Sequence, residues 1–301
     1  MADLREVMDL VDITMVRSED VVSESTFRDM ESIARRSRMR DGFIGEVLVV
    51  AFAGGTGSGK SSILNALASK DLVTTGIVRP TTQIAAAVYP NNLGADISPL
   101  LDSLGVETRI AHDTFDAIVV VDLPDFDSTA EAHRHVVEEV VPKVDAVVWV
   151  LDPEKYADPI LHDDFLSPLV PYESQFIFAM NQVDRLGDDA DDAVDTLNAL
   201  LTADGFDSPS IVAISAAPRE GDPDVASLND AIEQRLDVKK AAIAKIALDL
   251  RSLASLGWDA CHKVDRTDMG TTSLDALALA AASFVSLGVA AYEVHHSAMS
   301  R

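Results

Sequence analysis

The chain has 301 residues, which is enough for one large domain with helical additions. Its 24 Lys and Arg are outnumbered by 50 Asp and Glu, so the formal net charge is −26. A field of that sign repels the phosphates of RNA and DNA and argues against a nucleic-acid partner. The single cysteine, Cys261, excludes an intrachain disulfide. Because residues 1–20 are acidic and lack the apolar segment of a secretion signal, we expect a cytoplasmic protein.

Residues 1–44 are expected to form one or two amphipathic helices. Leu4, Val7 and Val11 recur at helical spacing, and a stop signal at residues 41–42 precedes the first strand. Such a stripe needs a partner surface. We therefore expect these helices to contact helices from the other end of the chain and to bury part of the stripe.

The most specific motif is a phosphate-binding loop of the form GxxxxGK[ST], with the sequence GGTGSGKS at residues 54–61. It follows an apolar run at 47–53 and precedes a helical pattern at 62–68, which is the strand–loop–helix context that the motif requires. Glycines let the backbone approach phosphates closely, and successive N–H groups at the helix N-terminus face the anion. Lys60 adds a point charge and the Ser61 hydroxyl can bind Mg²⁺. The expected phosphate contacts are Gly54, Thr56, Gly57, Ser58, Gly59, Lys60, Ser61 and Ser62.

Four polar segments follow the loop. Three of them lie at the carboxyl end of an expected strand, which is where open parallel sheets bind their ligands. They are DLPD at 122–125, NQVD at 181–184 and SAA at 215–217, and the fourth segment is RPTT at 79–82.

Apolar runs and helical periodicity divide the chain into a helical segment, 1–44, a nucleotide domain, 45–238, and a second helical segment, 239–301. The stretch 91–113 is expected to hold a loop, a short helix and a further strand. The last segment is expected to be helical apart from a break near 267–272. Within the nucleotide domain we expect strands at 47–53, 83–89, 117–121, 175–180 and 210–214, and helices at 132–141, 188–203 and 224–236.

With GGTGSGKS, RPTT, DLPD, NQVD and SAA in this order, the chain resembles the translation-factor-related class of P-loop GTPases, and within it the Era-like and dynamin-like groups. The resemblance covers roughly residues 45–238. The run WVLDPEKYAD at 149–158 is similar to a narrower group, the bacterial YfjP-type GTPases. The resemblance implies an α/β fold: a Ras-like P-loop GTPase domain with a mostly parallel sheet, flanked by N- and C-terminal α-helical extensions. It also implies GTP or GDP with Mg²⁺ as ligands.

The chemistry of the NQVD and SAA segments favours guanine. The Asp184 carboxylate can accept both N1–H and the N2 amino group of guanine, whereas adenine would leave it unpaired. Asn181 would hold the loops together beside the base, and the Ala216 N–H, next to Ser215, would meet guanine O6. The family's NKxD motif has a lysine where this chain has Gln182, so weaker base affinity is expected.

Three residues are expected to form the Mg²⁺ site, and two of them are also expected to serve the hydrolysis together with Lys60. Ser61 would bind the metal directly and Asp122 would hold it through water. A threonine of the RPTT segment would complete the shell, and Thr81 and Thr82 are both candidates; the resemblance favours Thr82. The catalytic set is then Lys60, Thr82 and Asp122.

Asp125 departs from the family pattern. It stands where the DxxG motif has a glycine whose N–H senses the γ-phosphate, and no Gln follows to orient a water. An inward carboxylate would repel the γ-phosphate, whereas an outward one would leave the backbone N–H usable. We therefore expect slow hydrolysis, assisted by a protein effector or by a second copy in a homodimer.

The stretch 276–292 contains no charged residue. As a helix it would span about 25 Å, short of the hydrocarbon core of about 30 Å, so a buried helix is favoured over a membrane span. Three functions fit the whole chain: a slowly hydrolysing GTP switch, a dynamin-like mechanoenzyme associated with the inner face of the membrane, and a GTP sensor or scaffold without hydrolysis.

Overall fold

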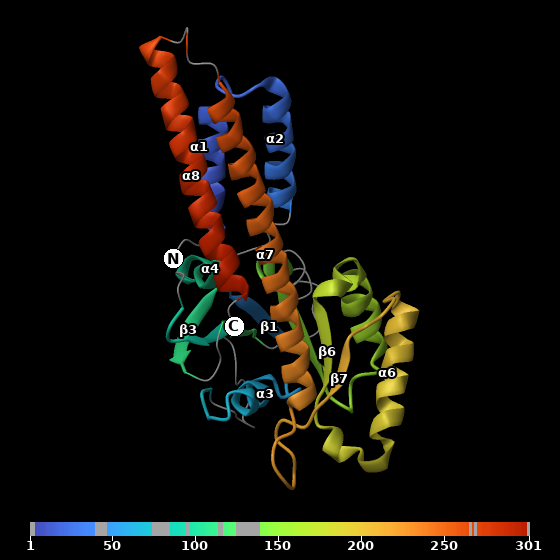
Figure 1. Cartoon of the computed structure of the whole chain (residues 1–301). Coiled ribbons are helices and arrows are strands. Elements are labelled where there is room, and N and C mark those ends of the chain that lie inside the picture. The colour runs from blue at the N-terminus through green and yellow to red at the C-terminus, as the bar shows by residue number, and fades with distance from the viewer. Residues whose placement is uncertain are drawn as a thin grey trace. The chain divides into compact units, whose positions relative to one another are not determined.

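A computed structural model describes residues 4–39, 47–73, 85–93, 97–113, 117–124, 139–264, 267 and 270–299. The chain divides into two compact units. The sheet unit comprises residues Val47–Leu236, and the helical unit combines Met1–Glu46 with Asp237–Arg301. Figure 1 shows the elements of each unit.

The sheet unit is built on a seven-stranded sheet in the order β3-β2-β4-β1-β5-β6-β7. Every neighbouring pair is parallel except β2 and β4, which are antiparallel. The expected mostly parallel α/β fold is thus confirmed. The strands are β1 (Leu48–Gly54), β2 (Ala85–Pro90), β3 (Val106–His112), β4 (Ile118–Asp122), β5 (Ala146–Leu151), β6 (Phe176–Met180) and β7 (Ile211–Ala213).

The central strands are buried on both faces. All residues of β1, β4, β5 and β6 are buried, which is why these segments read as continuous apolar runs rather than as alternating ones. β5 is absent from the strands expected above, although Ala146–Leu151 is such a run. It pairs with β1 on one side and with β6 on the other, so it completes the middle of the sheet.

Helices from both halves of this unit cover the sheet. Ile63 and Leu64 of α3 and Leu228 and Ile232 of α7 belong to one buried cluster with alternate residues of the strands. The expected helix at 132–141 lies largely outside the described residues. The helices here are α3 (Lys60–Leu67), α4 (Ser98–Ser103), α6 (Ala190–Asp204), the first part of α7 (Ala226–Lys263), short 3-10 helices at Val141–Lys143, Ser167–Gln175, Val183–Arg185 and Gly187–Asp189, and a π-helix at Leu161–Leu166.

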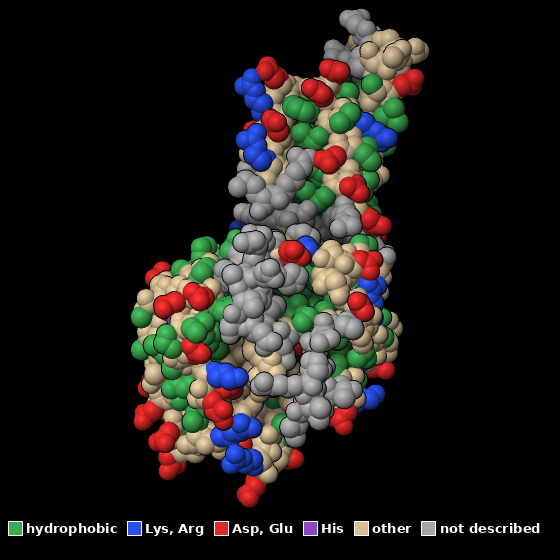
Figure 2. Space-filling view, turned by 180° about the vertical axis from the view of Figure 1, so that it is seen from behind, with side chains coloured by type: hydrophobic (Ala, Val, Ile, Leu, Met, Phe, Trp, Pro, Cys, Tyr) green, Lys and Arg blue, Asp and Glu red, His purple; other side chains and the backbone are tan. Residues whose placement is uncertain are grey.

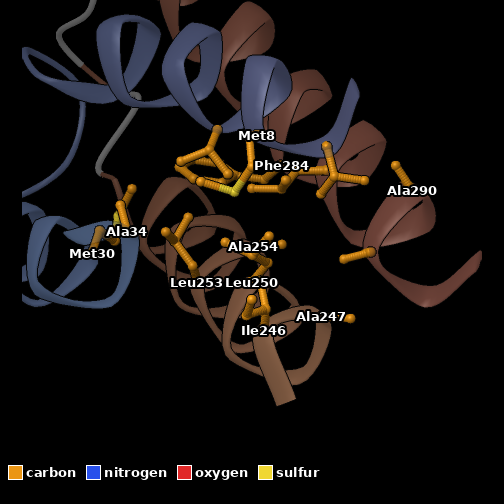
Figure 3. Close-up of a cluster of buried hydrophobic side chains, with 14 of the residues drawn as sticks. Met8, Met30, Ala34, Ile246, Ala247, Leu250, Leu253, Ala254, Phe284 and Ala290 are labelled. Carbon is orange, nitrogen blue, oxygen red and sulfur yellow. The ribbon is translucent and has the colours of Figure 1, made fainter. Parts of the chain in front are cut away.

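The helical unit packs α1 (Leu4–Ser18), α2 (Glu24–Met39), the second part of α7 and α8 (Thr271–Met299) around one apolar core. Figure 3 shows Met8 of α1 and Phe284 of α8 facing Leu250 and Leu253 of α7. Met30 and Ala34 of α2 close the core.

Contact between the helices of the two chain ends is confirmed. α1 packs against α8, and Val7 and Val11 are fully buried in the shared core. The Leu4 side chain lies outside the described part of the structure. The expected end of a helix at 236 is wrong, because α7 continues to Lys263. Helical periodicity carries no signal for a unit boundary inside a continuous helix.

Acidic side chains are spread over the described surface of both units. The face drawn in Figure 2 carries Asp and Glu side chains on each unit, interspersed with Lys and Arg. The net charge of −26 predicts such an excess of acidic side chains at the surface. A lysine that meets no carboxylate is therefore informative in this chain.

Gly257 of α7 is expected to tolerate no side chain. A Cβ at this position would overlap the ring of Phe284, which is 1% exposed. Gly257→Ala should lower the free energy of unfolding by about 1–3 kcal/mol, because overpacking outweighs the gain of about 0.5–1 kcal/mol from replacing a helical glycine. Thermal unfolding followed by circular dichroism measures the change.

The matched control is Gly288→Ala in α8. Its Cβ would make an ordinary contact of 3.5 Å with Ala254, so this variant should be at least as stable as the parent protein. Equal stability of the two alanine variants would contradict the packing described for α7 and α8.

Candidate nucleotide-binding site

The phosphate loop connects β1 to α3. β1 ends at Gly54 and α3 begins at Lys60, so the loop residues present their N–H groups beside a helix N-terminus. The Lys60 ammonium donates to the carbonyl oxygen of Gly54 at 2.9 Å and lies 3.5 Å from that of Gly55. Lys60 is only 4% exposed, so the loop holds a buried cation against its own carbonyl groups. A phosphate anion would suit this position better than a neutral carbonyl does.

At two positions of the loop only glycine fits, because neighbouring segments pack closely against the backbone there. Gly59 has φ of +96°, and a Cβ there would overlap the side-chain amide of Asn181. A Cβ on Gly54 would lie 2.5 Å from the carbonyl oxygen of Val150 in β5. The loop therefore touches both β5 and the segment that follows β6, and side chains are excluded at both contacts.

Oxygen ligands for a hard cation meet at the start of α3. The Ser61 hydroxyl donates to Oδ2 of Asp122 at 2.9 Å, and Asp122 is 1% exposed at the end of β4. A hydroxyl beside a carboxylate is the donor set that Mg²⁺ prefers. Ser58 in the loop is also buried, and its hydroxyl has no hydrogen-bond partner among the described residues. These residues fit a Mg²⁺–phosphate group. Thr81, Thr82 and Asp125 lie outside the described residues.

Asn181 and Gln182 connect the NQVD segment to the phosphate loop. Asn181 Nδ2 donates to the carbonyl oxygen of Ser58 at 2.8 Å, and Gln182 Nε2 donates to that of Gly57 at 3.1 Å. Gln182 adopts a left-handed φ of +64°, which directs its side chain back to the loop. The glutamine at this position of the NQVD segment thus joins the segment to the phosphate loop.

The segments expected to read the base are also tied together. Asp184 N donates to Ser215 Oγ at 3.1 Å, and the exposed carboxylate of Asp184 accepts the Arg219 N–H at 3.3 Å. The Ala216 N–H, which was expected to meet guanine O6, donates to Asn181 Oδ1 at 3.1 Å. In this structure that donor therefore stabilises the loop itself.

A cavity of about 610 Å³ adjoins these segments. It lies between α3 and the residues that follow β7, and its volume suits a ligand of nucleotide size. Two of the expected site residues, Ser62 and Ala216, line it. The other lining residues are Asn65, Ala66, Ser69, Lys70, Asp71, Ala217, Asp222 and Pro223.

Asn65 of α3 is a site neighbour that the sequence analysis missed. Its Oδ1 accepts the N–H groups of Leu72 and Val73 at 2.9 Å each, and its Nδ2 donates to the Val73 carbonyl at 2.8 Å. It thereby fixes the chain that leads from α3 toward the RPTT segment. No spacing rule marks an asparagine inside a helix for this role, and only its helical position beyond the loop could have suggested it.

The central part of the chain matches a protein-family model. Residues 49–182 match the model described as 50S ribosome-binding GTPase. These residues include β1 apart from Leu48, the phosphate loop, Asp122, Asn181 and Gln182. A search of curated proteins found no match.

Solved structures to which the chain shows similarity include a bacterial dynamin described as an oligomerised pair that senses and tethers membranes, with a TM-score of 0.48 and 13% identity. The match covers 86% of this chain and 48% of that one, so the chain spans about half the length of the dynamin. Era, in complex with MgGDPNP and part of 16S ribosomal RNA, has a TM-score of 0.42 and 20% identity over 68% of this chain and 67% of its own. Toc33 from Arabidopsis thaliana, in complex with GDP and Mg²⁺, has a TM-score of 0.42 and 12% identity, covering 75% of this chain and 95% of its own.

The family match and the loop geometry bear on the same residues. The matched segment begins in β1 and ends at Gln182, whose side chain returns to the phosphate loop. Residues 49–182 are therefore similar to this GTPase family in sequence, and they hold the phosphate loop between a strand and a helix.

Proposed function

We propose that the protein is a guanine-nucleotide switch that binds GTP and hydrolyses it slowly to GDP and phosphate. The observation that carries this proposal is the pair of contacts from Asn181 and Gln182 to the phosphate loop. They join the segment expected to read the base to the segment expected to bind phosphate. One ligand that has both groups, a guanine nucleotide, would engage both segments at once.

Lys60, Ser61 and Asp122 are proposed to serve the phosphates and the metal. Mg²⁺, when bound, neutralises charge on the phosphates. Ser61 would supply a direct oxygen ligand and Asp122 would hold metal-bound water, which agrees with their contact of 2.9 Å. Thr82, by the resemblance, would supply the remaining ligand. When a nucleotide binds, the Lys60 ammonium would exchange its hydrogen bond to the Gly54 carbonyl for one to a phosphate oxygen.

Guanine recognition is assigned to Asp184, with Ser215 and Ala216 as its support. Ser215 Oγ accepts the Asp184 N–H and thereby orients Asp184. The carboxylate of Asp184 is exposed to solvent and accepts the Arg219 N–H. An ionised carboxylate accepts two hydrogen bonds from guanine, which adenine cannot supply. Asn181 and Gln182 would hold the segment against the phosphate loop.

Slow turnover follows from the sequence at Asp125, where the glycine of the family pattern is missing. Nor does the residue after it supply a glutamine that could orient water. A second copy of the chain or a protein effector would then accelerate the reaction. We propose a cytoplasmic location for this activity.

A membrane-associated GTPase is the second candidate, and α8 is the observation that favours it. This helix has 29 residues, and its most apolar window has a mean hydropathy of 1.9 and is 39% buried. Leu279, Val285, Val289 and Tyr292 are exposed on it. By length and composition the helix could cross a membrane, and a buried core helix passes the same test. Peripheral contact with the inner face of the membrane is the form that we propose.

One experiment separates these functions. We expect the purified protein to bind GTP and GDP but not ATP, and to release phosphate at about 10⁻⁴ to 10⁻² s⁻¹, as P-loop GTPases do without an accelerating partner. Phosphate release is measured with and without vesicles of neutral lipid, chosen because the acidic chain would be repelled by anionic lipid. Equal affinity for ATP and GTP would overturn the guanine assignment. Strong acceleration by vesicles would favour the second candidate, and tight GTP binding without phosphate release would favour a sensor or scaffold.

A further inference from the structure

A second lysine, Lys155, reaches the phosphate loop from outside the motif. Its Nζ donates to the carbonyl oxygen of Thr56 at 3.4 Å, from a residue 99 positions away in the chain. Lys155 lies just after β5, which pairs with β1 up to the register Gly54–Val150. Because the two strands are parallel neighbours, the segments that follow them leave the sheet at the same edge.

We propose that Lys155 is a phosphate-binding residue that favours GTP over GDP, and that a buried pair, His162 and Asp204, is its positioning device. The proposal deepens the function proposed above and rests on it. It adds a cation to the site from a segment that the phosphate-loop motif does not include.

The turn that carries Lys155 is fixed by its own hydrogen bonds. Asp152 Oδ1 accepts the Glu154 N–H at 2.9 Å, and the Asp152 carbonyl accepts the N–H groups of Lys155 and Tyr156 at 3.2 and 3.0 Å. The Lys155 carbonyl accepts the Asp158 N–H at 3.0 Å. The backbone of Lys155 is therefore held while its side chain is exposed and can turn toward a ligand.

His162 ties this turn to the end of α6. Its Nε2 lies 2.8 Å from the Tyr156 carbonyl oxygen, and its Nδ1 lies 2.6 Å from Oδ2 of Asp204. The two side chains are only 6% and 10% exposed. A carbonyl oxygen only accepts, so Nε2 donates to the Tyr156 carbonyl. The ring is thus held by hydrogen bonds on both nitrogens, and it fixes Tyr156, the residue next to Lys155.

The charge around Lys155 points to an anionic ligand. The chain has 50 acidic residues, yet among the described residues the Lys155 ammonium meets a backbone carbonyl and no carboxylate within 4.0 Å. Lys60 also donates to a carbonyl oxygen of this loop, that of Gly54. Two ammonium groups on one phosphate loop suit a more highly charged anion, and the additional charge of GTP relative to GDP lies on its terminal phosphate.

The test compares the Kd of GDP with that of a non-hydrolysable GTP analogue in the presence of Mg²⁺, measured by titration calorimetry. Lys155→Ala should raise the Kd of the GTP analogue by about 10-fold or more, as expected for the loss of one charge-assisted contact. It should raise the Kd of GDP by less than about 3-fold. The control is Lys143→Ala, since Lys143 also donates to a backbone carbonyl, that of Ser103, at 2.7 Å. This variant should leave both affinities unchanged.

His162→Gln tests the positioning role. It should reduce affinity for the GTP analogue and spare GDP, and it should add little to the effect of Lys155→Ala in the double variant, because both changes remove the same contact. Asp204→Ala provides the same test if His162→Gln unfolds. Equal losses for the two nucleotides, or additive losses in the double variant, would overturn the positioning role.

The outcomes also distinguish this inference from the proposed function. If the parent protein binds guanine nucleotides but Lys155→Ala keeps the parent ratio of the two affinities, the role of Lys155 is wrong and the function stands. If the parent protein prefers no guanine nucleotide, both fail.

Discussion

Replacing Lys60 with alanine should lower the affinities for both GTP and GDP by about 100-fold or more, a loss of about 3 kcal/mol in the free energy of binding. Lys60 is 4% exposed and its ammonium lies 2.9 Å from the Gly54 carbonyl oxygen, so the loop holds a largely desolvated cation. A phosphate contact in such a place is stronger than one at the open surface. Titration calorimetry with each nucleotide measures the loss.

Lys60→Met separates charge from packing in this experiment. Methionine keeps most of the buried volume and removes the ammonium, so it should lose as much affinity as alanine does. Circular dichroism shows whether both variants keep the fold. If both variants bind the nucleotides with affinities within about threefold of the parent value, the assignment of the phosphate site is wrong, because a charged contact contributes more than that.

Asp184→Asn should change the base that the protein prefers. Asparagine replaces one carboxylate oxygen with an amino group, so it loses an acceptor for guanine and gains a donor for the oxygen that xanthine carries at the same position. We expect GTP affinity to fall by about 100-fold, the range for a site left with a mismatched polar group, and XTP affinity to rise. Competition between the two nucleotides measures the change directly.

Asp188→Asn is the matched control for that experiment. Asp188 is exposed, follows Asp184 by a few residues and carries the same charge, but it has no predicted contact with the base. It should alter neither affinity by more than about twofold, because surface charges act weakly. A parallel change in both variants would attribute the effect to the general field of the acidic surface.

Local motifs predicted most of the sheet unit. The phosphate loop lies between β1 and α3 as expected, because the glycines and the flanking apolar runs specify the strand, turn and helix locally. The ends of β4 and β6 follow from the same kind of signal. The helix-to-helix contact of the two chain ends was also predictable, since the apolar stripe of α1 required a partner.

Contacts between distant residues were not predictable from the sequence. His162 pairs with Asp204, 42 residues away, and Lys155 meets Thr56, but neither pair forms a spaced motif. The donor of Ala216 was assigned to a ligand because only tertiary structure shows that Asn181 Oδ1 accepts it. Asn65 was overlooked for another reason, because its contacts with Leu72 and Val73 are local but belong to no sequence motif.

The close contact between Gly59 and Asn181 limits which substitutions this sequence can accept during evolution. A side chain at position 59 would collide with the amide of Asn181 and would also have to adopt a left-handed backbone. Loss of the amide would leave the Ser58 carbonyl and the Ala216 N–H without the partner that now joins them. A first change at either position is therefore costly, and descendants of this chain should retain both residues.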